Sequence, residues 1–189
     1  ANDIHNWALY EPGGARQFIN HLTSGTHYDM SITAEELPVS CFDVDGIHVA
    51  PMPTDVQYPI VERFIESKKE GQILSWDPQE LYLKEPRFNQ MAFKMLEMVD
   101  LFLPSREEVY AMCGKDELKH IIRTLAARGL KAIAVKMSVE GALVYQSKDN
   151  RIYHIPIYPS KTVDPTGAGD SFCGAFLTAF LRTSDAIES

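Results

Sequence analysis

The pattern of apolar and polar positions changes character near residue 45. Before that point, short alternating runs at 7–10 and 16–19 flank the turn-forming sequence Glu-Pro-Gly-Gly-Ala at 11–15, which predicts a β-hairpin. Two strands alone cannot bury both of their faces. We therefore expect this hairpin to pack on the main body of the protein, on a segment outside the chain, or on a second copy of itself.

From residue 46 onward, segments typical of strands and helices alternate. Short buried runs predict strands at 47–50, 73–76, 101–103 and 131–136. Helical spacing and end signals predict helices at 60–69, 88–98, 105–113 and 116–128. A hairpin is expected from 141–146 and 151–157 around a turn at 147–150. This alternation predicts an α/β fold with a mostly parallel sheet and helices on both faces.

Ligands of such folds bind at the carboxyl ends of the strands. In this chain those ends are the polar or proline-containing segments 76–77, 103–105 and 136–138. We therefore expect the functional residues to gather at one edge of the sheet.

Composition and charge exclude several classes of protein. With 45% apolar and 23% charged residues in 189, the chain is neither disordered, collagen-like nor a coiled coil. Its 18 basic and 26 acidic residues give a net charge of −8, which argues against a nucleic-acid partner because neutralising phosphates requires a basic excess. The six histidines show no metal-binding spacing, so we predict none of them as a metal ligand.

Cysteine usage and hydropathy bear on the compartment. The three cysteines are odd in number and form no C-x-x-C pair, which is typical of free thiols in a reducing environment. No signal peptide is visible in the first 25 residues, and the most apolar stretch, 172–181, is too short to span a bilayer. We expect a soluble, cytoplasmic protein with no membrane partner.

The most informative segment is 162–177, Thr-Val-Asp-Pro-Thr-Gly-Ala-Gly-Asp-Ser-Phe-Cys-Gly-Ala-Phe-Leu. Apolar residues recur at helical spacing after Asp170, which places the Gly-Ala-Gly run at a helix N-terminus. Unpartnered amides and the helix dipole make that end an anion pocket. The run is not a Walker A motif, because an acid follows the second glycine. An acid beside a phosphate site is suited to accept the proton of an attacking hydroxyl; taken alone, it is most often a helix cap.

The string at 164–172 closely resembles the signature of the ribokinase-like, or pfkB, carbohydrate kinases, commonly written Asp-Thr-Thr-Gly-Ala-Gly-Asp-x-Phe. Only Pro165 departs from it. The resemblance implies a ribokinase-like fold with a small N-terminal β lid. It also implies an ATP- and Mg²⁺-dependent phosphotransferase that acts on a hydroxyl of a small sugar, sugar acid or nucleoside.

The resemblance also assigns roles to individual residues of this string. Asp170 stands at the position of the catalytic base. The hole for charge on the moving phosphoryl group is formed by the amides of Gly167, Ala168, Gly169 and Asp170. Some members of the family bind a monovalent cation at the positions of Asp164 and Thr166, which adds K⁺ as an optional cofactor.

A second matching element lies at 105–108, after a predicted strand. It is similar to the family's Asn-x-x-Glu element, whose glutamate organises Mg²⁺ and phosphates through water, with Ser105 in place of the asparagine. The resemblance therefore places Ser105 and Glu108 near the nucleotide and gives Glu108 a water-mediated contact with Mg²⁺. Without the resemblance, Ser105 and Glu108 form a helix capping box.

A third element, 134–142, resembles the nucleotide-side strand and turn that usually ends Thr-Leu-Gly-x-x-Gly-Ala. Lys136 stands at the threonine, Ser138 at the first glycine, and Gly141 is kept. Lys136 could reach a triphosphate as a point charge or simply end a strand in solvent, and Ser138 matters if the turn requires a positive φ. The Asp-Pro-Gln run at 77–79 is similar to the family's Asp-Pro-Asn, although a strand stop explains it equally well.

The resemblance covers the later two-thirds of a typical family member. Residues 1–44 would be part of the lid, which often forms a dimer clasp, so a homodimer through the hairpin is expected. Residues 45–189 would be the nucleotide-binding core, incomplete at both ends. Two alternatives remain open: a non-catalytic nucleotide- or sugar-binding regulatory protein of the same fold, and an interaction protein that uses the hairpin as its dimer surface.

Overall fold

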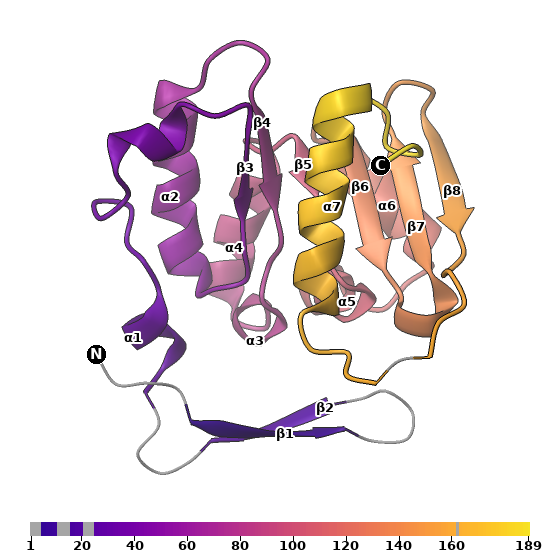
Figure 1. Cartoon of the computed structure of the whole chain (residues 1–189), viewed down its shortest axis with the longest axis horizontal. Helices are drawn as coiled ribbons and strands as arrows, with labels where there is room; N and C mark the ends of the chain where they lie inside the picture. The colour runs from indigo at the N-terminus through magenta and orange to yellow at the C-terminus, as the bar shows by residue number, and fades with distance from the viewer. Residues whose placement is uncertain (1–4, 11–15, 21–24, 162) are drawn as a thin grey trace.

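The computed structural model of the chain describes residues 5–10, 16–20, 25–161 and 163–189. Its main body is a six-stranded sheet with the order β3-β4-β5-β6-β7-β8 (Figure 1). The first four strands pair in parallel and the last two antiparallel. The mostly parallel sheet predicted from the sequence is therefore confirmed. The strands are β3 (Gly46–Val49), β4 (Ile73–Trp76), β5 (Leu101–Phe102), β6 (Ala132–Lys136), β7 (Ala142–Gln146) and β8 (Arg151–Ile155).

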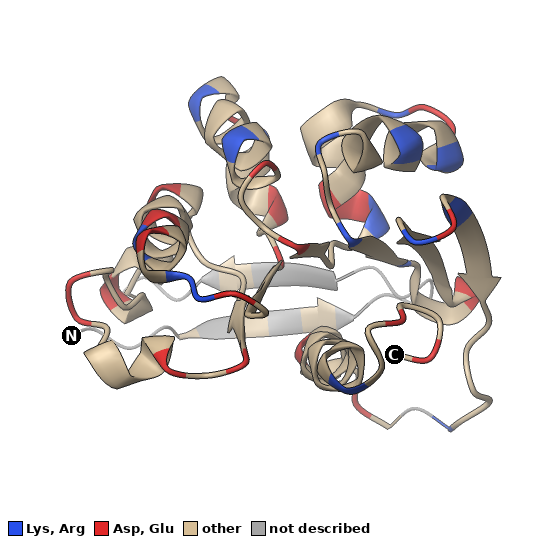
Figure 2. Cartoon of the chain, turned by 90° about the horizontal axis from the view of Figure 1, so that it is seen from above, with Lys and Arg blue, Asp and Glu red and all other residues tan. Residues whose placement is uncertain are grey.

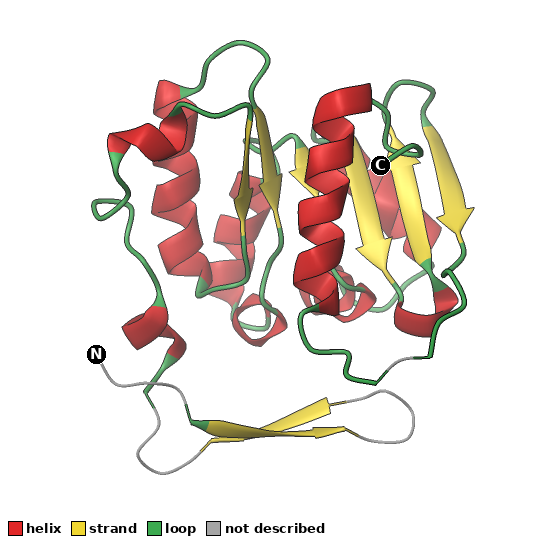
Figure 3. Ribbon diagram, in the orientation of Figure 1, coloured by secondary structure: helices red, strands yellow, loops and turns green. Residues whose placement is uncertain are grey.

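Helices cover both faces of this sheet, as Figure 3 shows. One face carries α7 (Ala168–Thr183), and the other carries α2 (Thr54–Ser67), α4 (Pro86–Met95), α5 (Arg106–Cys113) and α6 (Leu118–Ala126). Shorter elements complete the described chain: α1 (His27–Met30), α3 (Glu80–Leu83), and the 3-10 turns η1 (Val39–Phe42) and η2 (Ser138–Glu140).

The strands are apolar on both sides because each side faces a different helical layer. Trp76 stacks on Phe102 at 5.0 Å between ring centroids, in the core beneath α2, α4, α5 and α6. Leu101 and Leu103 belong to the second core, which packs against Phe176 and its neighbours on α7. Packing in the two cores positions the carboxyl ends of β4, β5 and β6 beside the first turn of α7.

The predicted boundaries differ from the observed ones where local signals mislead. The helix predicted at 60–69 is α2, which begins at Thr54 and contains Pro59. Because proline removes a backbone hydrogen bond inside a helix, Pro59 concealed the first turn. The other predicted elements are present with ends shifted by a few residues, whereas α1, α3 and η1 are too short to give a periodic signal.

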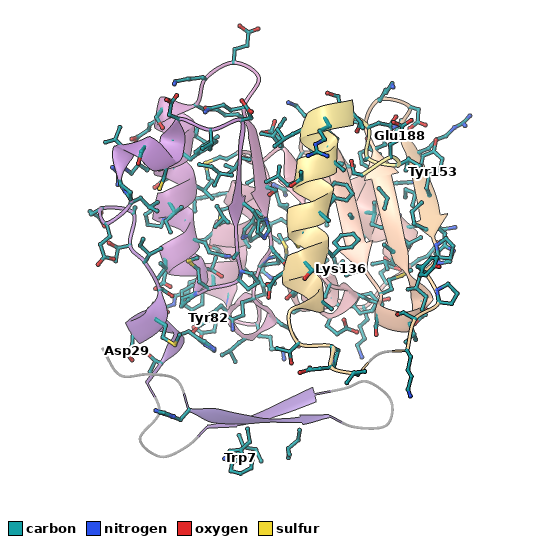
Figure 4. All side chains as sticks on the ribbon, viewed as in Figure 1. Trp7, Asp29, Tyr82, Lys136, Tyr153 and Glu188 are labelled. Carbon is teal, nitrogen blue, oxygen red and sulfur yellow. The ribbon has the colours of Figure 1, made fainter. Side chains whose placement is uncertain are left out.

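The predicted N-terminal hairpin strands pair as a separate sheet. β1 (Asn6–Tyr10) and β2 (Arg16–Asn20) are antiparallel, with Trp7 opposite Ile19, and the predicted turn at 11–15 lies outside the described residues. Figure 1 places this sheet across the end of the main body at which α7 begins. In Figure 4 the Trp7 side chain extends away from the body.

The charge distribution is mixed. Figure 2 shows basic and acidic residues interspersed over the helices and loops that the structure describes. Among these described residues, no helix has both the length and the apolar character needed to cross a membrane.

Candidate active site

A cavity of about 580 Å³ lies at the carboxyl ends of the strands, between the first turn of α7 and the exits of β6 and β8. This volume falls within the range of small-molecule sites. The walls come from six separate parts of the chain, including the segments after β4, β5 and β6. All the residues that the sequence assigned to catalysis or nucleotide binding line it: Ser105, Glu108, Lys136, Ser138, Gly141, Gly167, Ala168, Gly169 and Asp170.

The first turn of α7 forms one wall. Gly167 is its N-cap with φ +76°, a conformation that favours glycine, and its carbonyl accepts the Ser171 amide at 2.9 Å. Asp170 is exposed in the first turn and faces the same cavity. The positive end of the helix dipole therefore lies beside an accessible carboxylate.

One of the expected anion-binding amides is occupied in this conformation. The amide of Ala168 donates to the carbonyl of Pro165 at 3.1 Å, closing the turn that precedes α7. Contact between this amide and an anion would require that turn to open.

The element at the start of α5 is a complete capping box. The Glu108 amide donates to the Ser105 hydroxyl at 3.2 Å, and the Ser105 amide donates to Glu108 Oε2 at 2.6 Å. Burial, followed by the proximity of Asp77, raises the pKa of Glu108 to about 7. Glu108 therefore acts as a helix cap and also lines the cavity, so the two interpretations of this element are compatible.

Lys136, at the end of β6, is neither free nor in open solvent. Its ammonium forms an ion pair with Asp77, and the two side chains are 17% and 4% exposed. Figure 4 labels Lys136 beside the first turn of α7. Burial alone would lower the pKa of Lys136, but Asp77 outweighs burial and raises it. Desolvation raises the pKa of Asp77, and Lys136 opposes that shift.

Gln57, a buried residue of α2, fixes the backbone around Asp77. Its amide nitrogen donates to the carbonyls of Ala50 at 2.7 Å and Asp77 at 2.9 Å, and its oxygen accepts the Trp76 indole N–H at 3.0 Å. Gln57 thus joins the ends of β3 and β4 to α2. Sequence reasoning missed this residue, because a glutamine in a helix gives no sign that it is buried.

The turn between β6 and β7 requires positive φ at two positions. Ser138 has φ +53° and Gly141 has φ +86°. A Cβ on Gly141 would lie 2.1 Å from the Ile155 carbonyl oxygen, so glycine is required there for space as well as for conformation. From the sequence, serine in place of glycine at this position matters if the turn requires a positive φ, and Ser138 does adopt one.

Asp164 and Thr166 do not line the cavity. The Asp164 carboxylate accepts the Thr166 amide at 2.8 Å, and this hydrogen bond lowers the Asp164 pKa. The proposed cation positions thus form a local turn in this structure. Conversely, the cavity has a wall at 155–158, at the end of β8 and directly after it, that sequence reasoning did not identify. In the structure its apolar residues Ile157 and Tyr158 are exposed, which no sequence pattern indicated.

Comparisons with known proteins agree with this picture. A model of the pfkB family of carbohydrate kinases matches residues 8–189. The chain is 27% identical over 148 residues to a cytidine kinase of Thermococcus kodakarensis, covering 77% of this chain and 51% of that protein. It is 26% identical over 160 residues to a deoxyribokinase of Salmonella typhimurium, covering 82% of this chain and 50% of that protein.

A solved structure is similar over nearly the whole chain. An E. coli protein described as a ribokinase II, in complex with ATP and Mg²⁺, superposes with a TM-score of 0.72 at 25% identity. The match covers 96% of this chain and 59% of that one. The chain therefore spans about half the length of the curated relatives cited above.

Proposed function

The chain belongs to the pfkB family of carbohydrate kinases, and from that membership we propose that its protein transfers the γ-phosphoryl group of ATP to a hydroxyl of a small sugar, sugar acid or nucleoside. One observation carries the proposal. Residues assigned to the reaction from three separate segments of sequence line a single cavity at the carboxyl edge of the sheet, beside a helix N-terminus. Positioning and electrostatics supply most of the catalysis in phosphoryl transfer.

In this proposal Asp170 accepts the proton of the attacking hydroxyl. Asp170 is exposed, faces the cavity and lies in the first turn of α7. The amides of Gly167, Gly169 and Asp170, together with that of Ala168 once its turn opens, stabilise negative charge on the transferring group.

The residues around the cavity fit a magnesium nucleotide. Bound ATP and Mg²⁺ supply the phosphoryl group and neutralise its charge. Glu108 offers the hard oxygen donors that Mg²⁺ prefers, directly or through water. Lys136, Ser138, Ser105 and Gly141 form the nucleotide side of the proposed site. The Asp164 and Thr166 pair stays a proposed monovalent cation site outside the cavity wall.

The acceptor is a pentose-like sugar or a nucleoside in our proposal. The relatives named cytidine kinase and deoxyribokinase both act, by their names, on molecules with a pentose ring. A primary hydroxyl next to Asp170 is the group that would be phosphorylated. We further propose that residues 45–189 form the nucleotide-binding core and residues 1–44 part of a lid.

We also propose that two copies associate through the β1–β2 sheet. Trp7, Leu9 and Ile19 are 69%, 47% and 53% exposed. Trp7 and Ile19 are cross-strand partners and Leu9 is two residues from Trp7, so the three side chains share one face. A second copy of that face would bury it.

The test of the catalytic proposal is Asp170→Asn in the protein at its native length. The matched control is Glu66→Gln, which removes an exposed acid near the C-terminal end of α2, at the opposite edge of the sheet. ATP consumption is measured across a panel of pentoses, other sugars, sugar acids and nucleosides, and nucleotide binding is measured by calorimetry. We expect Asp170→Asn to lower kcat by at least about 10³-fold with nearly unchanged ATP binding, and Glu66→Gln to leave both unchanged.

Full turnover in Asp170→Asn would refute the assignment of the base. Nucleotide binding by the wild type without turnover of any acceptor would favour the regulatory alternative. Absence of nucleotide binding would favour the interaction protein.

A further inference from the structure

Next to the cavity, which Asp77 itself lines, three elements bring together side chains that bind transition metals. His48 lies on β3, Asp77 follows β4, and Cys173 lies on α7. One ligand atom from each lies within 4.8 Å of the other two. Imidazole nitrogen, carboxylate oxygen and thiolate sulfur are the donor set of protein-bound Zn²⁺. The residues are far apart in sequence, so their spacing gave no metal-binding signal.

His48 Nδ1 lies 2.9 Å from Ser75 Oγ, which also lies 3.3 Å from the Ile47 carbonyl oxygen. When the Ser75 hydroxyl donates to that carbonyl, it accepts from His48 Nδ1–H, and the outer nitrogen of His48 carries a lone pair. Zinc binding would require this tautomer. His48 Nε2 is buried and has no hydrogen-bond partner among the residues that the structure describes. A second-shell hydrogen bond of this kind orients the metal-binding histidines of zinc sites.

Asp77 also has an unused ligand atom. The residue is 3% exposed, and its Oδ2 receives both Lys136 Nζ and the Cys173 thiol. Its Oδ1 is buried without a partner in the described part of the chain. Buried carboxylate oxygens are normally satisfied, and each exception requires an explanation. Two unsatisfied atoms in one cluster indicate a ligand that accepts lone pairs.

Cys173 completes the cluster from the opposite side. Its side chain is fully buried, and Sγ lies 3.4 Å from Asp77 Oδ2 and 3.5 Å from Lys136 Nζ. In a tetrahedral zinc site the ligand atoms are about 3.5 Å apart, given bonds of about 2.0 to 2.3 Å. Small rotations of the three side chains would reach that geometry.

We propose that His48, Asp77 and Cys173 bind Zn²⁺, with a fourth position open to water. The thiol proton leaves to solvent on binding. Lys136 is the competing cation, because its ammonium already holds the Asp77 carboxylate. Since Lys136 also lines the cavity, its ammonium has space to turn away from the incoming metal.

Zinc binding would also act on the reaction. Cys173 lies in the same helical stretch as Asp170, three residues further along α7, and Lys136 would leave its partner. We therefore expect Zn²⁺ to inhibit phosphoryl transfer. This consequence rests on the proposed function, whereas the binding itself does not.

The binding test uses Co²⁺ as a spectroscopic probe of the zinc site, in the presence of excess Mg²⁺, which prefers oxygen ligands. The wild type should show thiolate-to-cobalt charge-transfer absorption that Zn²⁺ abolishes. Cys173→Ser should lose this absorption, and His48→Asn should weaken Zn²⁺ affinity at least about tenfold. Lys136→Met should bind at least about tenfold more tightly, because a neighbouring positive charge is removed. Cys113→Ser, a half-buried thiol on α5, is the control and should match the wild type.

Each result decides the proposal. Absence of the charge-transfer band in the wild type overturns it without relying on any variant. A band that survives Cys173→Ser, in a variant shown to fold by circular dichroism, also overturns it. If the enzyme is active and binds zinc without being inhibited, the expected inhibition is refuted and the zinc site is supported. An enzyme without turnover refutes the proposed function, and the spectroscopic result stands by itself.

Discussion

At the scale of single residues, Ser138 stores conformational strain beside the cavity. It adopts φ +53°, which costs an L-residue about 1 to 2 kcal/mol, whereas glycine pays only about 0.5 to 1 kcal/mol in chain entropy. We predict that Ser138→Gly raises the free energy of unfolding by about 0.5 kcal/mol, measured by urea titration. Asn150→Gly, at φ +56°, is the matched control with a smaller gain, because asparagine tolerates this region.

A loss of stability in Ser138→Gly would contradict the strain argument. It would mean that the Ser138 side chain makes a compensating interaction in solution. Nucleotide affinity measured on the same variant shows whether the hydroxyl also contributes to binding.

Gln57 makes a second prediction at this scale. Gln57→Leu keeps the approximate volume but leaves the Trp76 indole N–H and the Ala50 and Asp77 carbonyls without their shared partner. Each unsatisfied buried group costs about 1 to 3 kcal/mol, so we expect the three groups together to lower the free energy of unfolding by at least about 3 kcal/mol. Gln90→Leu, on the exposed side of α4, should change it by less than about 0.5 kcal/mol. Equal effects of the two substitutions would refute the role of Gln57.

At the scale of elements, substitutions in the capping box of α5 distinguish the contribution of Ser105 to helix stability from its proposed contribution to nucleotide binding. Ser105→Ala removes the hydroxyl that accepts the Glu108 amide and should lower the free energy of unfolding by about 1 kcal/mol. Ser105→Asn should preserve it, because asparagine caps equally well. Both are measured by thermal and urea denaturation.

Activity of the same two variants tests the proposed nucleotide role. Asparagine is the residue of the family element that this segment resembles, so Ser105→Asn should retain turnover. A cap that is preserved in Ser105→Asn together with a large loss of turnover would show that the hydroxyl itself is required.

Helices and strands could be predicted from the sequence where their local residue pattern agrees with their burial in the folded chain. The start of α7 follows from Gly167 and the helical spacing after Asp170, and β4 from a short buried run. The start of α2 was not predictable, because Pro59 argues against a helix that tertiary packing supports. The Lys136–Asp77 ion pair could not be predicted from the sequence either. It depends on the register of parallel strands that are separated in the sheet by β5, and no local pattern encodes it.

At the scale of the whole molecule, the cavity lies where the two cores meet. Asp77 is held by Gln57 from the α2 side and contacts Cys173 from the α7 side. The polar cluster is therefore a junction between both helical layers. We therefore expect substitutions in either layer that touch Asp77 to affect the Lys136–Asp77 ion pair in the cavity wall.

The exposed face of the β1–β2 sheet gives the last prediction, which concerns assembly. If two copies associate there, Trp7→Ser combined with Ile19→Thr removes the largest apolar groups from the interface, where buried aromatic anchors contribute most of the binding energy. We expect the dissociation constant of the dimer to rise at least about 30-fold, measured by sedimentation velocity over a concentration series. Val39→Thr removes an even more exposed apolar side chain from η1 and should leave the dimer intact. A wild-type protein that stays monomeric at high micromolar concentration would refute association through this face. A dimer that the double substitution leaves unchanged would also refute it.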